Sequence, residues 1–67
     1  MFDVKAAFAR LRDKVLTFEE LLAEIAIMRK ENLSEFSPEI KNRDVLEVAM
    51  RHEFVSEDNS GKWHIAA

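Results

Sequence analysis

The stretch EFVSEDNSGKWHI, residues 53–65, decides the fold that the sequence predicts. Two short runs of alternating apolar and polar residues flank the turn-forming cluster Asp58–Gly61, which is typical of a β-hairpin. We predict that Glu57 pairs with Lys62 across this turn, because the two opposite charges then face each other. That register places three apolar side chains on one face, namely Phe54, Trp63 and Ile65. A two-stranded hairpin is marginally stable alone in water, so this face should rest on the preceding residues.

A first helix is indicated near the N-terminus. Asp3 is a suitable N-cap residue. The apolar residues that follow recur at spacings of four, three and four, which lays them on one stripe of a helix. These residues are Val4, Phe8, Leu11 and Val15. Val15 and Leu16 are also β-prone, so the sequence allows a very short strand just before Thr17.

A second helix follows almost at once. Thr17 and Glu20 have the spacing of a capping box, in which each side chain accepts a hydrogen bond from the other residue's backbone N–H. We therefore predict a helix that begins at Phe18 and runs to about Glu31. Its inner face consists of Leu21, Leu22, Ile25 and Met28.

The segment NLSEFSPEIKN, residues 32–42, interrupts the helical pattern. Ser37 and Pro38 are suited to the start of a helical turn, and we predict a single turn at 38–41. A third helix is then expected over 43–53, with Asn42 as its N-cap and Asp44 near the positive end of its dipole. Its inner residues are Val45, Leu46 and Ala49.

Length and composition limit the chain to one small domain. It has 67 residues, a hydrophobic fraction of 48% and no cysteine, so its stability must come from one core rather than from disulfides. No apolar stretch approaches the roughly 20 residues that span a bilayer. We expect one α+β domain over residues 1–67, a three-helix bundle followed by a C-terminal β-hairpin. We also expect a cytoplasmic location, because the lack of cysteine fits a reducing compartment and the N-terminus lacks the layout of a secretion signal.

The order helix, short strand, helix, turn, helix and two-stranded hairpin resembles the winged helix-turn-helix superfamily. The resemblance rests on the order of elements from Asp3 to Ile65 and on the position of the hairpin. It implies duplex DNA as the partner, with the third helix in the major groove and the hairpin, or wing, along the phosphates or the minor groove. The residues that it implies for DNA contact are Lys41, Arg43, Glu47 and Arg51 around the third helix, and Asn59, Ser60 and Lys62 on the wing.

The charge pattern favours DNA less strongly than the resemblance does. Residues 17–40 carry six acidic and two basic side chains, and the whole chain has a net charge of −3. Glu47 is spaced four residues from both Arg43 and Arg51 and can pair with either of them, while Asp44 brings this face to zero charge. Any contact with nucleic acid must therefore be local, since the chain as a whole does not attract phosphates.

A protein-interaction module is the alternative. The second helix turns Glu20, Glu24, Ile27 and Glu31 outward on one stripe, which suits a basic protein partner with an apolar anchor. Phe36, in the loop that follows, is a second candidate for an exposed apolar contact. An ordinary solvated acidic face has the same pattern, so the sequence leaves DNA and protein partners open.

We expect neither an enzyme nor a bound cofactor or metal. His52, Glu53 and His64 lack a further ligand at helical metal-binding spacing, and cysteine is absent. Gly61 is the only glycine and cannot form a phosphate-binding loop, and no serine or threonine lies in a recognised nucleophile motif. The sequence does not indicate an oligomeric state.

Overall fold

Two helices begin at the caps that the sequence predicts. In the computed structural model, which describes residues 3–37 and 39–67, α1 spans Val4–Ala9 and the Asp3 carboxylate accepts a hydrogen bond from Ala6 N at 3.1 Å. α2 spans Phe18–Glu31. At its start Thr17 Oγ1 accepts from Glu20 N at 3.1 Å, and Glu20 Oε1 accepts from Thr17 N at 2.8 Å. The predicted capping box and both ends of the second helix are confirmed.

The first helix is shorter than its apolar stripe predicts. It ends at Ala9, and a turn in which Asp13 has a φ of 68° leads into β1, Val15–Leu16. Aspartate is one of the few residues other than glycine that enter this left-handed region readily. The placement of Val15 on the helical stripe is therefore wrong, because its backbone joins the sheet and its side chain is 53% exposed. The short strand that the sequence allowed is confirmed.

The third helix also differs from the prediction at its N-terminus. A short 3₁₀ turn, η1, covers Leu33–Glu35, and α3 spans Asn42–Arg51. Its N-cap is Lys41, whose backbone N–H donates to Asp44 Oδ2 at 2.8 Å. Asn42 is not the cap, because its side-chain oxygen accepts a hydrogen bond from Arg29 Nη1 at 2.7 Å.

The predicted turn at 38–41 lies partly outside the described residues, since Pro38 is not among them. Within the described part of this loop, Ile40 N donates to Ser37 O at 3.0 Å.

The C-terminus of α3 is closed by a Schellman motif. The helix ends at Arg51, two residues before the predicted end. Glu53 takes a φ of 60°, its N–H donates to Met50 O at 3.0 Å, and Phe54 N donates to Ala49 O at 2.9 Å. Both bonds satisfy carbonyls of the last turn and point the chain toward the sheet. A glutamate occupies the position where glycine is usual, so this end of the helix could not be recognised from the residue type.

The sheet has three antiparallel strands in the order β1-β3-β2, where β2 is Val55–Glu57 and β3 is Trp63–Ile65. The hairpin register differs by one residue from the prediction, because Glu57 pairs with Trp63 and Val55 with Ile65. The cause is a loop one residue shorter than predicted: Asp58, not Glu57, lies opposite Lys62, and Asp58 N donates to Lys62 O at 2.8 Å. Three residues remain in the loop, as in hairpins whose last loop residue is a left-handed glycine.

The shifted register changes one residue of the inner face. Gly61 has a φ of 82°, which fits this loop type, and its N–H donates to Asp58 O at 3.1 Å. Trp63 and Ile65 point into the core as predicted, but Val55 rather than Phe54 joins them. Phe54 is half-buried at the edge of the core.

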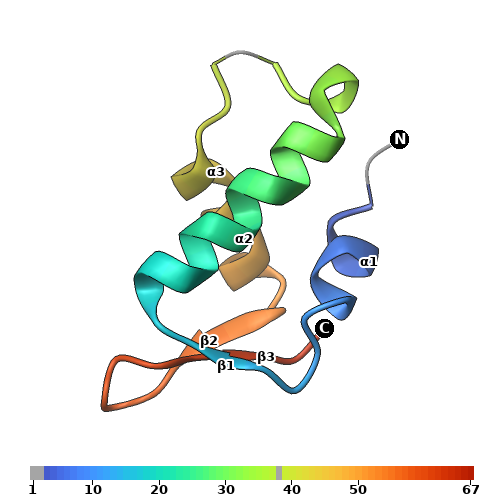
Figure 1. Ribbon diagram of the computed structural model, residues 1–67. Coiled ribbons are helices and arrows are strands. Elements are labelled where there is room, and N and C mark those ends of the chain that lie inside the picture. Colours follow the sequence, from blue (N-terminus) through green and yellow to red (C-terminus); the bar gives the residue numbers. More distant parts are fainter. Residues whose placement is uncertain (1–2, 38) are drawn as a thin grey trace.

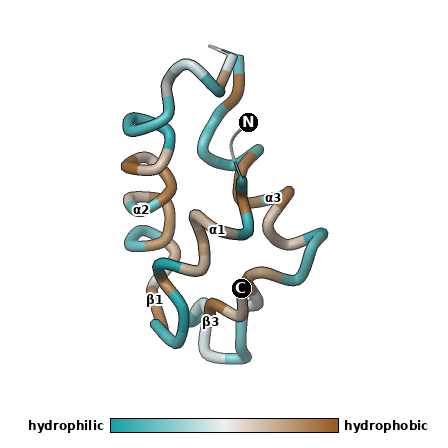
Figure 2. The backbone as a smooth tube through the Cα atoms, turned by 90° about the vertical axis from the view of Figure 1, so that its right-hand side faces the viewer, coloured by the Kyte–Doolittle hydropathy of each residue, from teal (hydrophilic) through white to brown (hydrophobic). Residues whose placement is uncertain are grey.

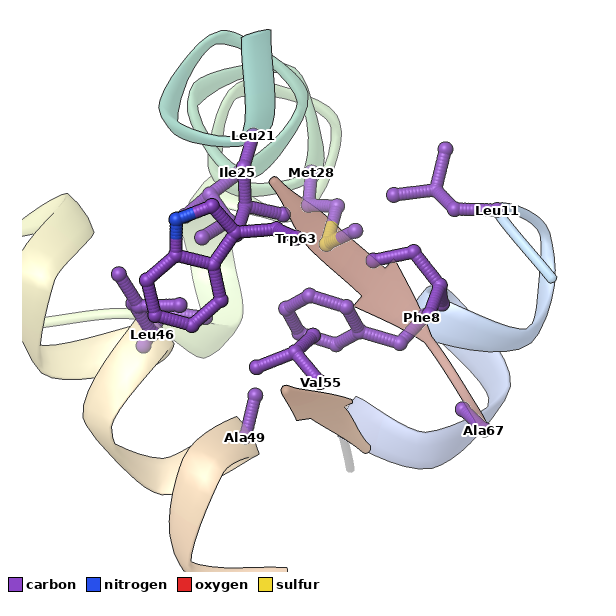
Figure 3. Packing of buried hydrophobic residues seen from close by; sticks show 12 residues of the cluster. Phe8, Leu11, Leu21, Ile25, Met28, Leu46, Ala49, Val55, Trp63 and Ala67 are labelled. Carbon is purple, nitrogen blue, oxygen red and sulfur yellow. The ribbon is translucent and has the colours of Figure 1, made fainter. Parts of the chain in front are cut away.

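One hydrophobic core lies between the helices and the sheet. α2 crosses above the sheet, with α1 on one side of it and α3 behind it (Figure 1). The apolar residues of α2 lie on the side turned toward α1 and α3 (Figure 2). Trp63, Phe8 and Val55 converge beneath α2 (Figure 3). The buried residues are Phe8, Leu11, Leu21, Ile25, Met28, Val45, Leu46, Ala49, Val55, Trp63, Ile65 and Ala67. The predicted α+β class, with three helices followed by a hairpin, is confirmed.

Candidate functional site

The outward face of α3 carries one internal ion pair. Arg51 Nη2 lies 3.1 Å from Glu47 Oε1, one helical turn away, and both side chains are exposed. This is the pairing that the spacing of four predicts. Met50 lies on the same helix and is 49% exposed. The face is therefore mixed, with one satisfied ion pair and one apolar side chain.

Three cations near α3 and the wing have no ion-pair partner among the described residues, namely Lys41, Arg43 and Lys62. The Arg43 guanidinium lies over the Phe18 ring, 6.0 Å from its centroid, which places the start of α3 against the start of α2. Lys62 is near enough to Glu20 to contribute to the lowering of that carboxyl's pKa, after the stronger effect of the hydrogen bonds from Thr17. On this side of the molecule, these three cations are the charged groups that an anionic partner would contact.

The wing tip is organised by the Asp58 carboxylate. Its Oδ1 accepts hydrogen bonds from Ser60 N at 2.9 Å, Ser60 Oγ at 2.8 Å and Lys62 N at 3.0 Å. Its Oδ2 lies 2.7 Å from His64 Nε2. These contacts, led by the one with His64, hold the pKa of Asp58 well below its usual range. The backbone amides of the tip already bind an anion, so the side chains of Asn59 and Lys62 are the ones left to face a partner.

We expect this arrangement to make the stability of the fold sensitive to acid. Because the folded-state pKa of Asp58 is lowered, its contribution is present above its ordinary pKa of about 3.9 and is lost as the pH falls below it. Asp58→Asn should therefore show a smaller loss of unfolding free energy between neutral and acid pH than the native chain, as measured by urea denaturation at several pH values. Glu20→Gln is the matched control, because hydrogen bonds also lower the pKa of Glu20, though less strongly. Equal acid sensitivity in Asp58→Asn and the native chain would contradict this role.

The acidic side chains on the outward stripe of α2 make several contacts within the molecule. Glu20 closes the capping box, Glu24 is half-buried, and Glu31 Oε1 lies 3.2 Å from Arg10 Nη1 of the turn after α1. Ile27 is 48% exposed, as predicted for an outward position. The stripe thus lies beside basic residues of the N-terminal segment, which helical spacing within α2 could not reveal.

Phe36 lies apart from this stripe. It is half-buried against the core and lines a groove of about 410 Å³ with Val4, Ile40, Val45 and Val48. Ile27 lines a different hollow, between α1 and α2. The two apolar residues predicted for partner binding are therefore not brought together in one hollow.

A third hollow, of about 380 Å³, lies between α3 and the wing. Its lining includes Phe18, Leu46, Met50 and Trp63. The Phe18 and Trp63 rings lie 6.3 Å apart, and the buried Trp63 Nε1 has no hydrogen-bond acceptor in the described part of the chain. This hollow cannot be predicted from the sequence, because its residues come from different elements and no spacing along the chain connects them.

No three His, Cys, Asp or Glu side chains in residues 3–37 and 39–67 gather closely enough to hold a metal ion. None of the helices in those ranges has both the length and the apolar character that crossing a membrane requires. No family model, characterised protein or solved structure matches this chain.

Proposed function

We propose that this protein is a winged-helix DNA-binding domain of a regulatory protein, which contacts duplex DNA through α3 and the wing. The observation that carries the proposal is that Lys41, Arg43 and Lys62, at the start of α3 and on the wing, have no ion-pair partner within residues 3–37 and 39–67. The order of elements, with β1 paired to the hairpin, supports it through the resemblance to winged helix-turn-helix domains. That support is an analogy at the level of the fold.

The nearby carboxylates reduce this positive charge without removing the unpaired cations. Asp44 accepts from Lys41 N, Glu47 pairs with Arg51, and Asp58 binds the wing amides and His64. Each of these carboxylates is hydrogen-bonded or ion-paired to a neighbouring group, but its negative charge still repels phosphates. The domain should therefore bind duplex DNA with modest affinity, through a few lysine and arginine contacts.

A titration of fluorescently labelled duplex at low salt tests this proposal. With about three phosphate contacts, the affinity should fall on the order of 40-fold between 50 and 200 mM salt. Arg43→Ala and Lys62→Ala should each weaken binding several-fold and lower the slope of log affinity against log salt by about one. Lys5→Ala is the matched control, because it removes the same charge from α1, which carries none of the residues proposed for DNA contact.

The control separates a local contact from a general effect of charge. An unchanged affinity in Lys5→Ala, beside a loss in Arg43→Ala and Lys62→Ala, would locate the contact at α3 and the wing. Absence of binding at low salt and high protein concentration would overturn the proposal, and so would equal losses in all three variants.

A further inference from the structure

The surface formed by α1, the turn after it and α2 has an apolar centre. A hollow of about 150 Å³ lies between these elements, and Ala7, Leu11, Ile27 and Met28 contribute to its lining. Leu11 and Met28 belong to the buried core, whereas Ile27 is about half exposed at the rim. An apolar side chain placed over a hollow of this kind is a suitable anchor for a contact with another protein surface.

Opposite charges lie on the two sides of this apolar centre. Arg10 and Lys14 line the hollow from the turn after α1, and Glu24 lines it from α2. Arg10 Nη1 reaches across to Glu31 Oε1 at 3.2 Å. Lys14 has no ion-pair partner among the described residues. Each molecule therefore presents a basic edge, formed by Arg10 and Lys14, beside an acidic edge, formed by Glu24 and Glu31.

We propose that this face pairs with the same face of a second copy of the chain. In a contact with two-fold symmetry, the same patch is used on both subunits, so that residue i meets residue j and residue j meets residue i. The basic edge of one copy then faces the acidic edge of the other, with Lys14 opposite Glu24 in both directions. Ile27 of each copy lies near the axis and covers the hollow of its partner.

Charge complementarity favours a second copy over a basic protein. A uniformly basic partner would approach Glu24 and Glu31 but would also meet Arg10 and Lys14, which repel it. A copy of the same chain carries both signs in the matching arrangement. Like charges placed opposite each other are costly at an interface, so the arrangement of signs selects the partner.

The area needed for such a contact is available. A weak interface at the lower end of the specific size range buries about 600 Å² on each partner. The accessible surface of the chain is 4739 Å², so the contact would cover about one eighth of it. Ion pairs at exposed edges contribute little, and we expect a dimer that dissociates on dilution.

The proposal does not depend on DNA binding. The wing and α3 are not part of the hollow between α1 and α2, and the oligomeric state can be measured without DNA. Sedimentation of the full chain over a wide range of concentrations should show a reversible shift from monomer to dimer. A monomer at the highest concentration reached would overturn the proposal. Binding of an oligo-lysine peptide by that monomer, lost in Ile27→Asp, would assign the face to a basic partner instead.

Charge reversal tests the predicted pairing. Lys14→Glu and Glu24→Lys should each weaken dimerisation by about tenfold or more, because each places like charges opposite each other. An equimolar mixture of the two variants should form a heterodimer more stable than either homodimer, since both of its pairings join opposite charges, whereas both pairings of each homodimer join like charges. Glu57→Lys is the matched control, because Glu57 lies on β2 outside this face and its reversal should leave dimerisation unchanged.

A variant that removes the apolar anchor completes the test. Ile27→Asp should be monomeric while keeping the helical circular dichroism signal of the native chain. If Ile27→Asp does not fold, the mixing experiment decides. Failure of the mixture to form the heterodimer would overturn the proposed pairing.

Discussion

Replacing Trp63 by alanine is expected to remove about 3–5 kcal/mol of unfolding free energy, the usual cost of deleting a buried large aromatic side chain. The Trp63 side chain is 5% exposed and lies between the sheet and the helices, where it packs near Phe18 and Leu46. A domain of this length has a total stability of about 3–10 kcal/mol. Trp63→Ala should therefore lose a large share of the stability of the domain, which urea denaturation followed by far-ultraviolet circular dichroism will measure.

Trp63→Phe is the matched control for this prediction. It keeps an aromatic ring in the core and removes the indole N–H, which is buried and has no acceptor among the residues that the structure describes. Loss of that unpaired donor offsets part of the cost of the smaller ring, and we expect a loss below about 1.5 kcal/mol. If Trp63→Ala lost less than about 1 kcal/mol, the hairpin would not pack on the helices as described.

The sequence predicted those features that depend on residues close together in the chain. The start of α2 is an example, since Thr17 and Glu20 satisfy each other's backbone N–H groups without help from elsewhere. The buried faces of α2 and α3 follow from apolar spacing, and Ile25 and Ala49 are fully buried as predicted. Local chemistry and helical periodicity are strong in these segments, so tertiary packing does not override them.

Two predictions from the sequence were wrong, because the same local sequence pattern fits two different structures. Val15 has the spacing of a helical stripe and also the β-branched side chain of a strand residue, and pairing with His64 of β3 decides between them. The alternating pattern of the hairpin fits a four-residue or a three-residue loop. The choice depends on Asp58, whose carboxylate binds Lys62 N and brings the two residues opposite each other.

Contacts between residues of different helices and strands could not be predicted from the sequence. Arg10 and Glu31 are 21 residues apart, and their ion pair exists only because α1 and α2 pack side by side. The hollow between α3 and the wing joins Phe18 to Trp63 in the same way. Exposure of single site residues, such as Ile27 and Lys62, follows from helical or strand position. Whether a charged residue has an ion-pair partner in another element depends on the fold and not on its local sequence.

Phe8→Ala is the second change with a large expected effect, about 3–5 kcal/mol of unfolding free energy. α1 has six residues, too few for a helix to be stable by itself, and Phe8 is its one buried side chain. Phe8 is fully buried and lies near Val55 beneath α2 (Figure 3). Without that ring α1 keeps only the partly buried Val4 and Ala7 against the core, so backbone amides of α1 should lose protection from hydrogen exchange more strongly than those of α3. Val15→Ala is the control, since this exposed side chain should cost only about 0.5 kcal/mol. Equal losses in the two variants would contradict the assignment of Val15 to the surface and of Phe8 to the core.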